Sequence, residues 1–183
     1  MKHIGTQYIE TNRLILRRFE TADAQAMFDN WASDGEVTKY LTWPTHTDVS
    51  VTEQVLADWV FQYTNDDFYN WAIVLKANGP QPIGNVSVVR WAGKGDIPIG
   101  GYCLGRRWWR RGIMTEAWGA VIDFLFERVG VERITSYHDL NNPYSGDVMR
   151  KCGMRFEGIR EKSDRNNQGI CDTAHYSIER GAR

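Results

Sequence analysis

This sequence is poor in cysteine, in net charge and in long apolar runs, and each shortage excludes a class of protein. Its three cysteines, Cys103, Cys152 and Cys171, lie far apart without a CxxC pair, so neither a disulfide framework nor a zinc site is indicated. The 23 acidic residues balance 22 basic ones, whereas a domain that binds nucleic acid usually has a basic excess. No apolar run approaches the roughly 18 residues of a membrane helix, and the N-terminal residues lack an apolar signal core. We therefore expect a cytoplasmic protein with no membrane or nucleic-acid partner.

What the sequence does have is a regular succession of strand-like and helix-like segments. A chain of 183 residues is long enough for one well-buried domain. Alternating and β-branched runs predict strands over 13–19, 69–76, 83–91, 99–105, 132–138, 154–162 and 170–179. Apolar spacing predicts helices over 22–33, with Thr21 as a candidate N-cap, and over 52–64, 114–130 and 147–153. We predict a single α+β domain over residues 1–183, with a mostly antiparallel sheet of about seven strands and about four helices.

The segment RRWWRRGIMTEA, residues 106–117, stands between a predicted strand and the strongest predicted helix. Clustered arginines are usually a solvated surface, and a nucleic-acid patch or a membrane-surface patch are further interpretations. A loop that enters a helix also presents unpaired backbone N–H groups and the positive end of the helix dipole, which together bind anions. Neither GxxxxGK[ST] nor GxGxxG is present, so a phosphate site here belongs to neither of those kinds.

The order of elements, with RRWWRRGIMTEA after the fourth predicted strand and NNPYSGDVMRKCGM after the fifth, resembles the GNAT N-acetyltransferase superfamily. Within it the sequence is most similar to the RimJ and RimL branch, and the resemblance runs from ETNRLILRRF through PIGNVSVVRW to RNNQGICDTAHYSI. It implies a sheet splayed between the fourth and fifth strands, acetyl-CoA as cosubstrate and no metal. It also implies acetyl transfer to a primary amine, either a protein N-terminus or a small molecule, by a monomer or homodimer. The alternative is a catalytically weak acyl-CoA-binding module.

The resemblance implies an acyl-CoA loop of the pattern [Q/R]xxGx[G/A], which falls on residues 107–112. Gly112 matches the second glycine, and Arg110 stands where the first glycine would be. A negative φ leaves Arg110 unstrained, whereas a positive φ costs roughly 1–2 kcal/mol. The implied cofactor-binding residues are Tyr102, Cys103, Leu104, Arg107, Arg110, Arg111, Gly112, Ile113, Met114, Thr115, Asn142 and Ser145.

The same resemblance implies two catalytic groups on either side of the cleft. The Leu104 N–H, at the splayed end of the fourth strand, is expected to polarise the thioester carbonyl. Ser145, which has the family's NxxS spacing from Asn142, is expected to act as general acid toward the leaving thiolate. Considered without the resemblance, the spacing favours a helix cap at Ser145 and a simple turn at Asn142 and Pro143.

The general base is not fixed by the sequence. Many relatives carry a glutamate on the fourth strand at the position of Ile99 here. The remaining candidates are Asp96, Glu116, His138 and Asp139. Asp139 is the base that we carry forward, because it closes the fifth strand near the cleft.

Two other side chains have alternative interpretations. Cys103 would need a neighbouring base or positive field to act as a thiolate nucleophile, and the sequence pairs it with none, so we expect a structural cysteine. Trp43 lies in the loop TWPTHT after the first helix. We expect Trp43 to line the acceptor side, because such loops carry specificity.

Overall fold

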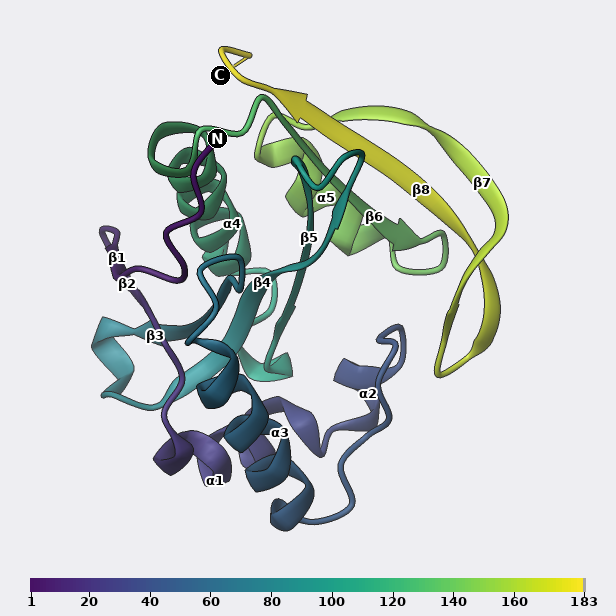
Figure 1. Cartoon of the computed structure of the whole chain (residues 1–183). Coiled ribbons are helices and arrows are strands. Elements are labelled where there is room, and N and C mark those ends of the chain that lie inside the picture. The colour runs from purple at the N-terminus through teal and green to yellow at the C-terminus, as the bar shows by residue number, and fades with distance from the viewer. Residues whose placement is uncertain (183) are drawn as a thin grey trace.

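The computed structural model describes residues 1–182 as one eight-stranded sheet with helices on both faces (Figure 1). The strands are β1 (Ile9–Glu10), β2 (Leu14–Arg17), β3 (Asn70–Leu75), β4 (Pro82–Ala92), β5 (Ile97–Leu104), β6 (Arg133–Asp139), β7 (Arg155–Asn166) and β8 (Gly169–Glu179). Their order across the sheet is β1-β2-β3-β4-β5-β6-β8-β7. β5 and β6 are parallel, and the other neighbouring strands are antiparallel.

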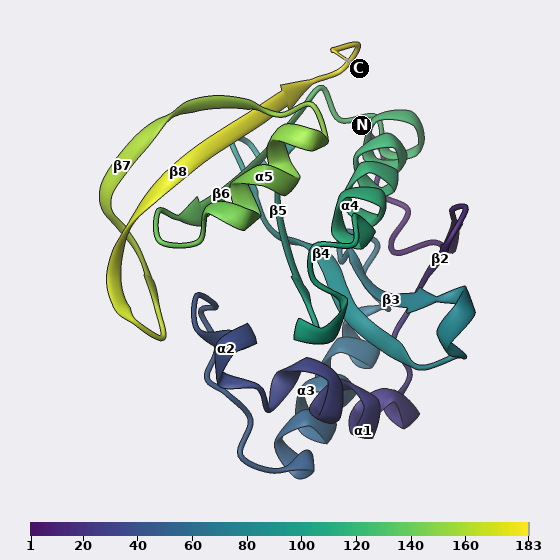
Figure 2. The same ribbon diagram turned by 180° about the vertical axis from the view of Figure 1, so that it is seen from behind.

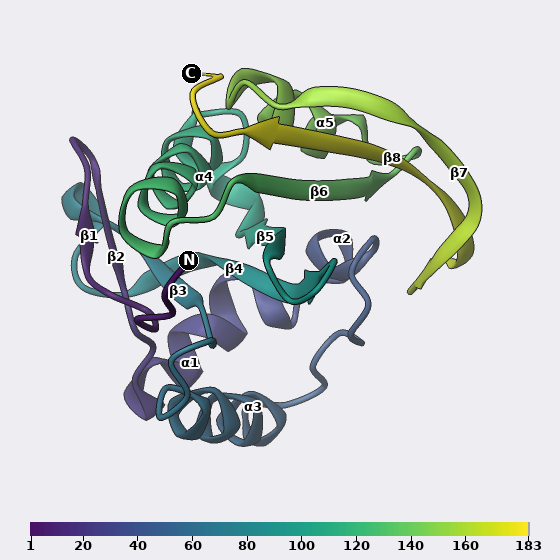
Figure 3. The same ribbon diagram turned by 45° about the horizontal axis from the view of Figure 1, so that its top comes forward.

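Two layers of helices enclose the sheet. They are α1 (Ala24–Met27), α2 (Gly35–Thr38), α3 (Val49–Gln62), α4 (Ile113–Phe124) and α5 (Pro143–Lys151). In Figure 3 the sheet lies between α4 and α5 above and α1 and α3 below. Figure 2, seen from behind, has α4 and α5 in front of the sheet. Each layer has its own core: Trp31 and Leu56 are fully buried on the α1 and α3 side, and Trp118 and Leu125 on the α4 side.

The predicted helix over 114–130 is confirmed as α4 and a π-helical turn, Leu125–Val129, that continues it. Its predicted apolar stripe is buried: Met114, Ala117, Val121, Phe124 and Leu125 are each at most 7% exposed. Gly130 ends the helix with φ 84°, a left-handed conformation that suits glycine. Packing of this helix therefore fixes its N-terminal turn, which begins at Gly112.

The structure corrects several details of the prediction. β1 and α2 were not predicted, because elements of two and four residues show no periodicity. Thr21 is not an N-cap: Glu20 has the extended N-cap conformation, and its N–H donates to Asp23 Oδ2 at 2.9 Å. The last predicted helix begins at Pro143 rather than at 147, since proline is well suited to a first helical turn.

The sheet opens between β5 and β6. These strands pair over only two positions, Ile99 with Thr135 and Gly100 with Ser136. The ring of Trp118 on α4 lies directly over Gly100, where an added Cβ would be 2.1 Å from its Cη2. The expected splay of the fourth and fifth predicted strands is therefore present, and it begins just beyond Gly100.

Candidate active site

Backbone groups of β5 line the opening. Gly105 N–H donates to Ile83 O on β4 at 2.8 Å. Hydrogen-bonding directions alternate along an antiparallel strand, so Cys103 pairs toward β4 and Leu104 turns its backbone groups the other way, toward β6.

The Leu104 N–H has no strand opposite it, because β6 pairing ends at Gly100. The Leu104 carbonyl, on the same side, accepts the indole N–H of Trp109 at 2.6 Å. That bond fixes the end of β5 and leaves a backbone N–H directed into the opening. This is the position at which the resemblance implied an oxyanion donor.

A cavity of about 350 Å³, which we call the donor cavity, lies between the end of β5, the N-terminus of α4 and α5. Of the expected cofactor residues, all but Arg107 and Arg111 line it: Tyr102, Cys103, Leu104, Arg110, Gly112, Ile113, Met114, Thr115, Asn142 and Ser145. Lys151 of α5 adds a positive charge to the lining that the sequence analysis did not single out. The cavity therefore combines the N-terminus of α4 with two cationic side chains, Arg110 and Lys151, and one carboxylate, Asp147, which pairs with Arg150.

The loop before α4 is held by glycine geometry and by one strained residue. Gly112 has φ 70° and serves as the N-cap of α4. Arg110 also has a positive φ, 59°, so the strained alternative of the sequence analysis is the one observed. The Arg110 guanidinium hydrogen-bonds the Tyr144 hydroxyl and lies 4.3 Å from the centre of that ring.

The other arginines of the segment point to different partners. Arg106 pairs with Asp34 at 3.0 Å. The guanidinium of Arg107 lies 4.4 Å from the centre of the Trp108 ring, and Trp108 itself is buried. The cluster is thus divided among local contacts and does not form one continuous basic face.

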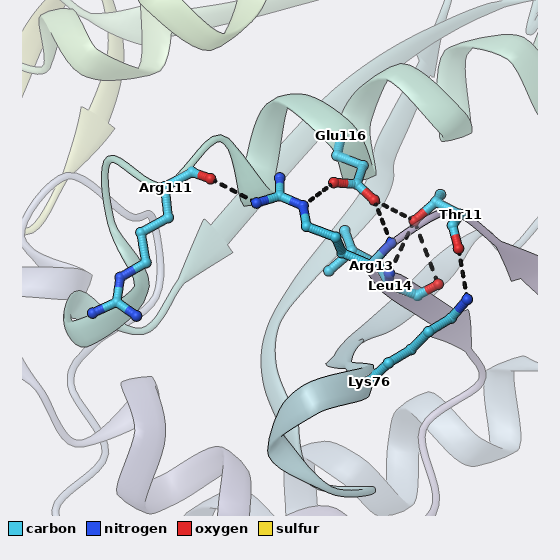
Figure 4. A network of polar contacts seen from close by, with 6 residues as sticks. All are labelled: Thr11, Arg13, Leu14, Lys76, Arg111 and Glu116. Atoms are coloured by element: carbon cyan, nitrogen blue, oxygen red, sulfur yellow. Dashed lines mark hydrogen bonds and ion pairs between the residues drawn. The ribbon is translucent and has the colours of Figure 1, made fainter.

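A network of hydrogen bonds and an ion pair joins the loop before α4 to the residues around the start of β2 (Figure 4). Glu116, in the first turn of α4, accepts hydrogen bonds from the Thr11 hydroxyl at 2.6 Å and from Arg13 N–H at 2.9 Å. The Arg13 guanidinium pairs with Glu116 at 2.6 Å and donates to the Arg111 carbonyl at 3.0 Å. Burial raises the pKa of Glu116, but these hydrogen bonds outweigh it and hold the pKa below its ordinary value. Glu116 lines neither the donor cavity nor the acceptor cavity described below, so this base candidate is excluded by its position.

Ser145 and Tyr102 join α5 to β5 across the opening. The Ser145 hydroxyl donates to the Tyr102 hydroxyl oxygen at 3.2 Å, and Tyr102 donates to the Ser145 carbonyl at 2.8 Å. Burial raises the pKa of Tyr102 far above its ordinary value. Ser145 is not the helix cap: Asn142 occupies that position, and Ser145 lies in the first turn of α5.

A second cavity, of about 370 Å³, lies on the opposite side of the opening, and we call it the acceptor cavity. Trp43 lines it, as the sequence analysis expected, together with Asp139 and His138. The two cavities share the lining residues Tyr40, Leu41, Tyr102, Cys103, Asn142 and Ser145. They therefore meet at the splayed end of β5.

Cys103 lies at this junction but is not prepared to act as a nucleophile. Its thiol donates to Asn85 Oδ1 at 2.8 Å, and burial raises its pKa to about 12. A thiolate would need the opposite environment. The expectation of a structural cysteine agrees with this geometry.

The base candidates on β6 are committed to structural contacts. His138 Nδ1 lies 2.7 Å from the Asp139 carbonyl, which only accepts, so this nitrogen carries the proton. Its Nε2 is buried against Gly146 without a hydrogen-bond partner in the part of the chain described, and burial lowers the pKa of His138. Asp139 accepts from Asn141 N–H at 2.8 Å and from Asn166 Nδ2 at 2.7 Å, so both of its carboxylate oxygens are engaged.

Asp164 and the turn between β7 and β8 that follows it bear on the acceptor cavity, and no sequence motif singles them out. Asp164 lines the acceptor cavity and forms no ion pair within residues 1–182. Asn167, in the turn itself, holds the segment that carries Trp43: its side-chain amide donates to the carbonyls of Thr38 at 2.9 Å and Trp43 at 2.8 Å, and its N–H donates to the Leu41 carbonyl at 3.2 Å. No local sequence signal identifies these contacts, because they join segments more than 120 residues apart.

Residues 1–182 contain no cluster of three His, Cys, Asp or Glu side chains able to hold a metal ion. No helix among them is long and apolar enough to cross a bilayer. Asp96, the remaining base candidate, accepts from Lys94 N–H in the β4–β5 turn and lines neither cavity.

Comparison with known proteins places this geometry in a family. The family model described as "Acetyltransferase (GNAT) domain" matches residues 13–155. The uncharacterized N-acetyltransferase YnaD of Bacillus subtilis (strain 168) is 27% identical over 171 residues, covering 93% of this chain and 96% of that protein.

A GNAT-family acetyltransferase from Bacillus anthracis has a TM-score of 0.81 at 24% identity, covering 94% of this chain and 98% of that chain. RimL, the ribosomal L7/L12 alpha-N-protein acetyltransferase, was solved with coenzyme A; its TM-score is 0.84 at 18% identity, covering 97% of this chain and 100% of that chain. These two structures share the fold of this chain. Because the family match spans most of the chain, this protein belongs to the GNAT family of acetyltransferases.

Proposed function

We propose that this protein transfers the acetyl group of acetyl-CoA to a primary amine by direct attack of the amine on the thioester. The observation that carries the proposal is the meeting of two cavities at the splayed end of β5. A donor on one side and an acceptor on the other would then bring their reacting atoms together at Leu104 and Ser145. Bringing two reactants together in this way supplies much of the rate in a bimolecular transfer.

The donor cavity suits acetyl-CoA in its charge and its backbone donors. The first N–H groups of α4 have no partner within the helix, and Gly112 allows a phosphate to approach them closely. Arg110 and Lys151 line the same cavity and add positive charge, and the carboxylate of Asp147 in that lining is paired with Arg150. The backbone of Tyr102 and Leu104 offers an unpaired strand edge to the amide groups of the pantetheine arm.

The chemistry requires stabilisation of negative charge on the thioester oxygen and then on the leaving sulfur. The Leu104 N–H is directed into the opening and fixed there by the end of β5, so it would meet the developing oxyanion without reorganisation. Ser145, whose hydroxyl lies 3.2 Å from that of Tyr102, would act as general acid: it would donate its hydroxyl hydrogen to the leaving thiolate and regain a proton from water in the cavity. Asn142, whose side chain lines both cavities, would contact the pantetheine arm.

The acceptor must reach the thioester as a neutral amine. Asp139 was our expected base, but both of its oxygens already accept hydrogen bonds. Asp164 lines the same cavity without a cationic partner, so we assign it the role of attracting the acceptor's ammonium group. The proton released by the amine would pass to water in the cavity. Asp164→Asn should then raise KM for the amine about tenfold and leave KM for acetyl-CoA unchanged.

Transfer is tested by incubating the protein with acetyl-CoA and a panel of primary amines: amino acids, polyamines, aminoglycosides and peptides with free N-termini. Release of the CoA thiol is followed colorimetrically, and the acetylated amine is identified by mass spectrometry. We expect CoA release that depends on the amine. Stabilisation by CoA in a thermal-shift assay without transfer to any amine would favour the alternative of an acyl-CoA-binding module.

The role of Ser145 is tested separately. Ser145→Ala should lower kcat by roughly 10²-fold or more with little change in KM for acetyl-CoA, since the hydroxyl acts on the leaving group. Tyr102→Phe is the matched variant, because it removes the hydroxyl to which Ser145 donates but keeps the serine. An unchanged kcat in Ser145→Ala would remove Ser145 from the mechanism.

A further inference from the structure

Arg13 stands beside the donor loop without lining the donor cavity. Its guanidinium makes two directed contacts: Nε pairs with Glu116 Oε2 at 2.6 Å, and one terminal nitrogen donates to the Arg111 carbonyl at 3.0 Å. The other terminal nitrogen lies 3.6 Å from the position that a Cβ of Gly112 would occupy. Figure 4 shows Arg13 lying between Glu116 and the Arg111 carbonyl.

The contact to the Arg111 carbonyl determines how the next peptide group is oriented. The Arg111 carbonyl and the Gly112 N–H belong to one planar trans peptide, in which the two groups point in opposite directions. Holding the carbonyl toward Arg13 therefore turns the Gly112 N–H away from Arg13. Gly112 lines the donor cavity, and its N–H makes no hydrogen bond within the described chain.

We infer that Arg13 is a positioning residue for the donor: by gripping the Arg111 carbonyl it aims the Gly112 N–H at the phosphates of CoA. This inference rests on the proposed function, because it supposes that CoA phosphates occupy the N-terminal turn of α4. Glycine at 112 has no side chain to hold this peptide in place, so an external contact is needed to fix its orientation. Arg13 supplies that contact from a different layer of the fold.

Glu116 keeps Arg13 in place. Its carboxylate takes the Arg13 backbone N–H at 2.9 Å and the guanidinium Nε at 2.6 Å, so both ends of the residue are fixed. Thr11 donates to the same carboxylate at 2.6 Å. Glu116 is in turn part of α4, and its own N–H donates to the Gly112 carbonyl at 3.1 Å. The two peptide groups on either side of Gly112 are thus tied to one ion pair.

A purely structural role for the ion pair, joining β2 to α4, must be separated from this one. The two roles affect the binding of different donors. A positioning role weakens the binding only of donors that carry the phosphates, whereas a general destabilisation of the domain weakens the binding of every donor. S-Acetylpantetheine has the thioester and the pantetheine arm of acetyl-CoA but no pyrophosphate or nucleotide, so it makes this comparison directly.

The test uses the full chain with Arg13→Ala, Arg13→Lys and Glu116→Gln. CoA affinity is measured by calorimetry, and KM is measured for acetyl-CoA and for S-acetylpantetheine. We expect Arg13→Ala to weaken CoA binding about tenfold, the worth of one charge-assisted hydrogen bond. KM for acetyl-CoA should rise in parallel, and KM for S-acetylpantetheine should not change. Arg13→Lys should be intermediate, because lysine keeps the charge but lacks the fork that reaches both partners.

Lys76→Ala is the matched control. Lys76 donates to the Thr11 carbonyl and pairs with Glu10, each at 2.7 Å, next to the same network but without contact to the donor loop (Figure 4). It should leave CoA affinity unchanged. Glu116→Gln, which keeps Arg13 but removes its ion pair, should weaken CoA binding about threefold and carries the test should Arg13→Ala fold poorly.

Each result decides the inference. If Arg13→Ala raised KM equally for acetyl-CoA and for S-acetylpantetheine, the inference would be overturned. Unaltered CoA affinity in both Arg13→Ala and Glu116→Gln would also overturn it. Absence of CoA binding in the unmodified protein would instead contradict the proposed function, so the two failures are distinguishable.

Discussion

Arg110 occupies a backbone conformation that glycine would accept more readily, and this leads to a prediction with a definite sign. Its φ is 59°, in the left-handed region where a Cβ costs roughly 1–2 kcal/mol. Its guanidinium contact with Tyr144, at 4.3 Å from the ring centre, offsets part of that cost with about 0.5–1 kcal/mol. Comparing Arg110→Gly with Arg110→Ala cancels the lost contact, since both variants remove it. What remains is the difference between glycine and alanine at a left-handed position.

At an ordinary position alanine is more stable than glycine by about 0.4–1 kcal/mol, because glycine leaves the unfolded chain more freedom. At Arg110 the left-handed strain should reverse this order, and Arg110→Gly should be the more stable variant by about 1 kcal/mol. Urea unfolding measures the difference, and thermal melting should show it as roughly 2–4 °C.

Arg107 provides the control, because it lies in the 3₁₀ turn Arg106–Trp108 and also stacks on an aromatic ring, that of Trp108. At this position Arg107→Gly should be less stable than Arg107→Ala. An Arg110→Ala protein as stable as Arg110→Gly would refute the reasoning. Position 110, where the family pattern has its first glycine, would then not require glycine.

Cys103 and Gly100 at the opening, and Glu116 beside the donor loop, each give a further prediction. Cys103→Ala should retain acetyl transfer, and intact-mass analysis of the unmodified protein with acetyl-CoA alone should find no acetylated chain, because burial raises the thiol pKa to about 12. Gly100→Ala should lower the free energy of unfolding by about 1–3 kcal/mol or more in urea titrations, since its Cβ would lie 2.1 Å from the Trp118 ring. The folded-state pKa of Glu116 is lowered, so its contribution to stability is present above the ordinary value of 4.5 and is lost as pH falls through the lower, folded-state pKa. Glu116→Gln should therefore flatten the fall of stability in acid, measured by thermal melting between pH 7 and pH 3.

The parts of the fold with strong local periodicity were predictable from the sequence. The buried stripe of α4 follows from residue spacing, and the apolar, β-branched runs of β3 and β4 indicate strands. Arg110 and Gly112 could be placed on the donor loop by motif, and the structure then decided the φ of Arg110. Short elements such as α2, whose four residues contain no repeat, were not predictable.

The acceptor side was harder to predict because its walls come from distant segments. Asn167 reaches three carbonyls between residues 38 and 43, and nothing in the local sequence around either segment indicates that they meet. For Asp139 the position was predicted correctly but its hydrogen-bond partners were not. Its place at the end of β6 was foreseen, but its hydrogen bond with Asn166, on another strand, depends on tertiary packing. Arg13 was likewise invisible as a contact of the donor loop, since its partners lie about 100 residues away.

The central claim is that donor and acceptor occupy adjoining cavities at the same time and that acetyl passes directly between them. Initial velocities measured while both acetyl-CoA and an accepted amine are varied test this most directly. The two cavities share Tyr102, Cys103 and Ser145 at their junction, so the account predicts a ternary complex and double-reciprocal lines that intersect. Parallel lines, the pattern of an acetylated-enzyme intermediate, would contradict it.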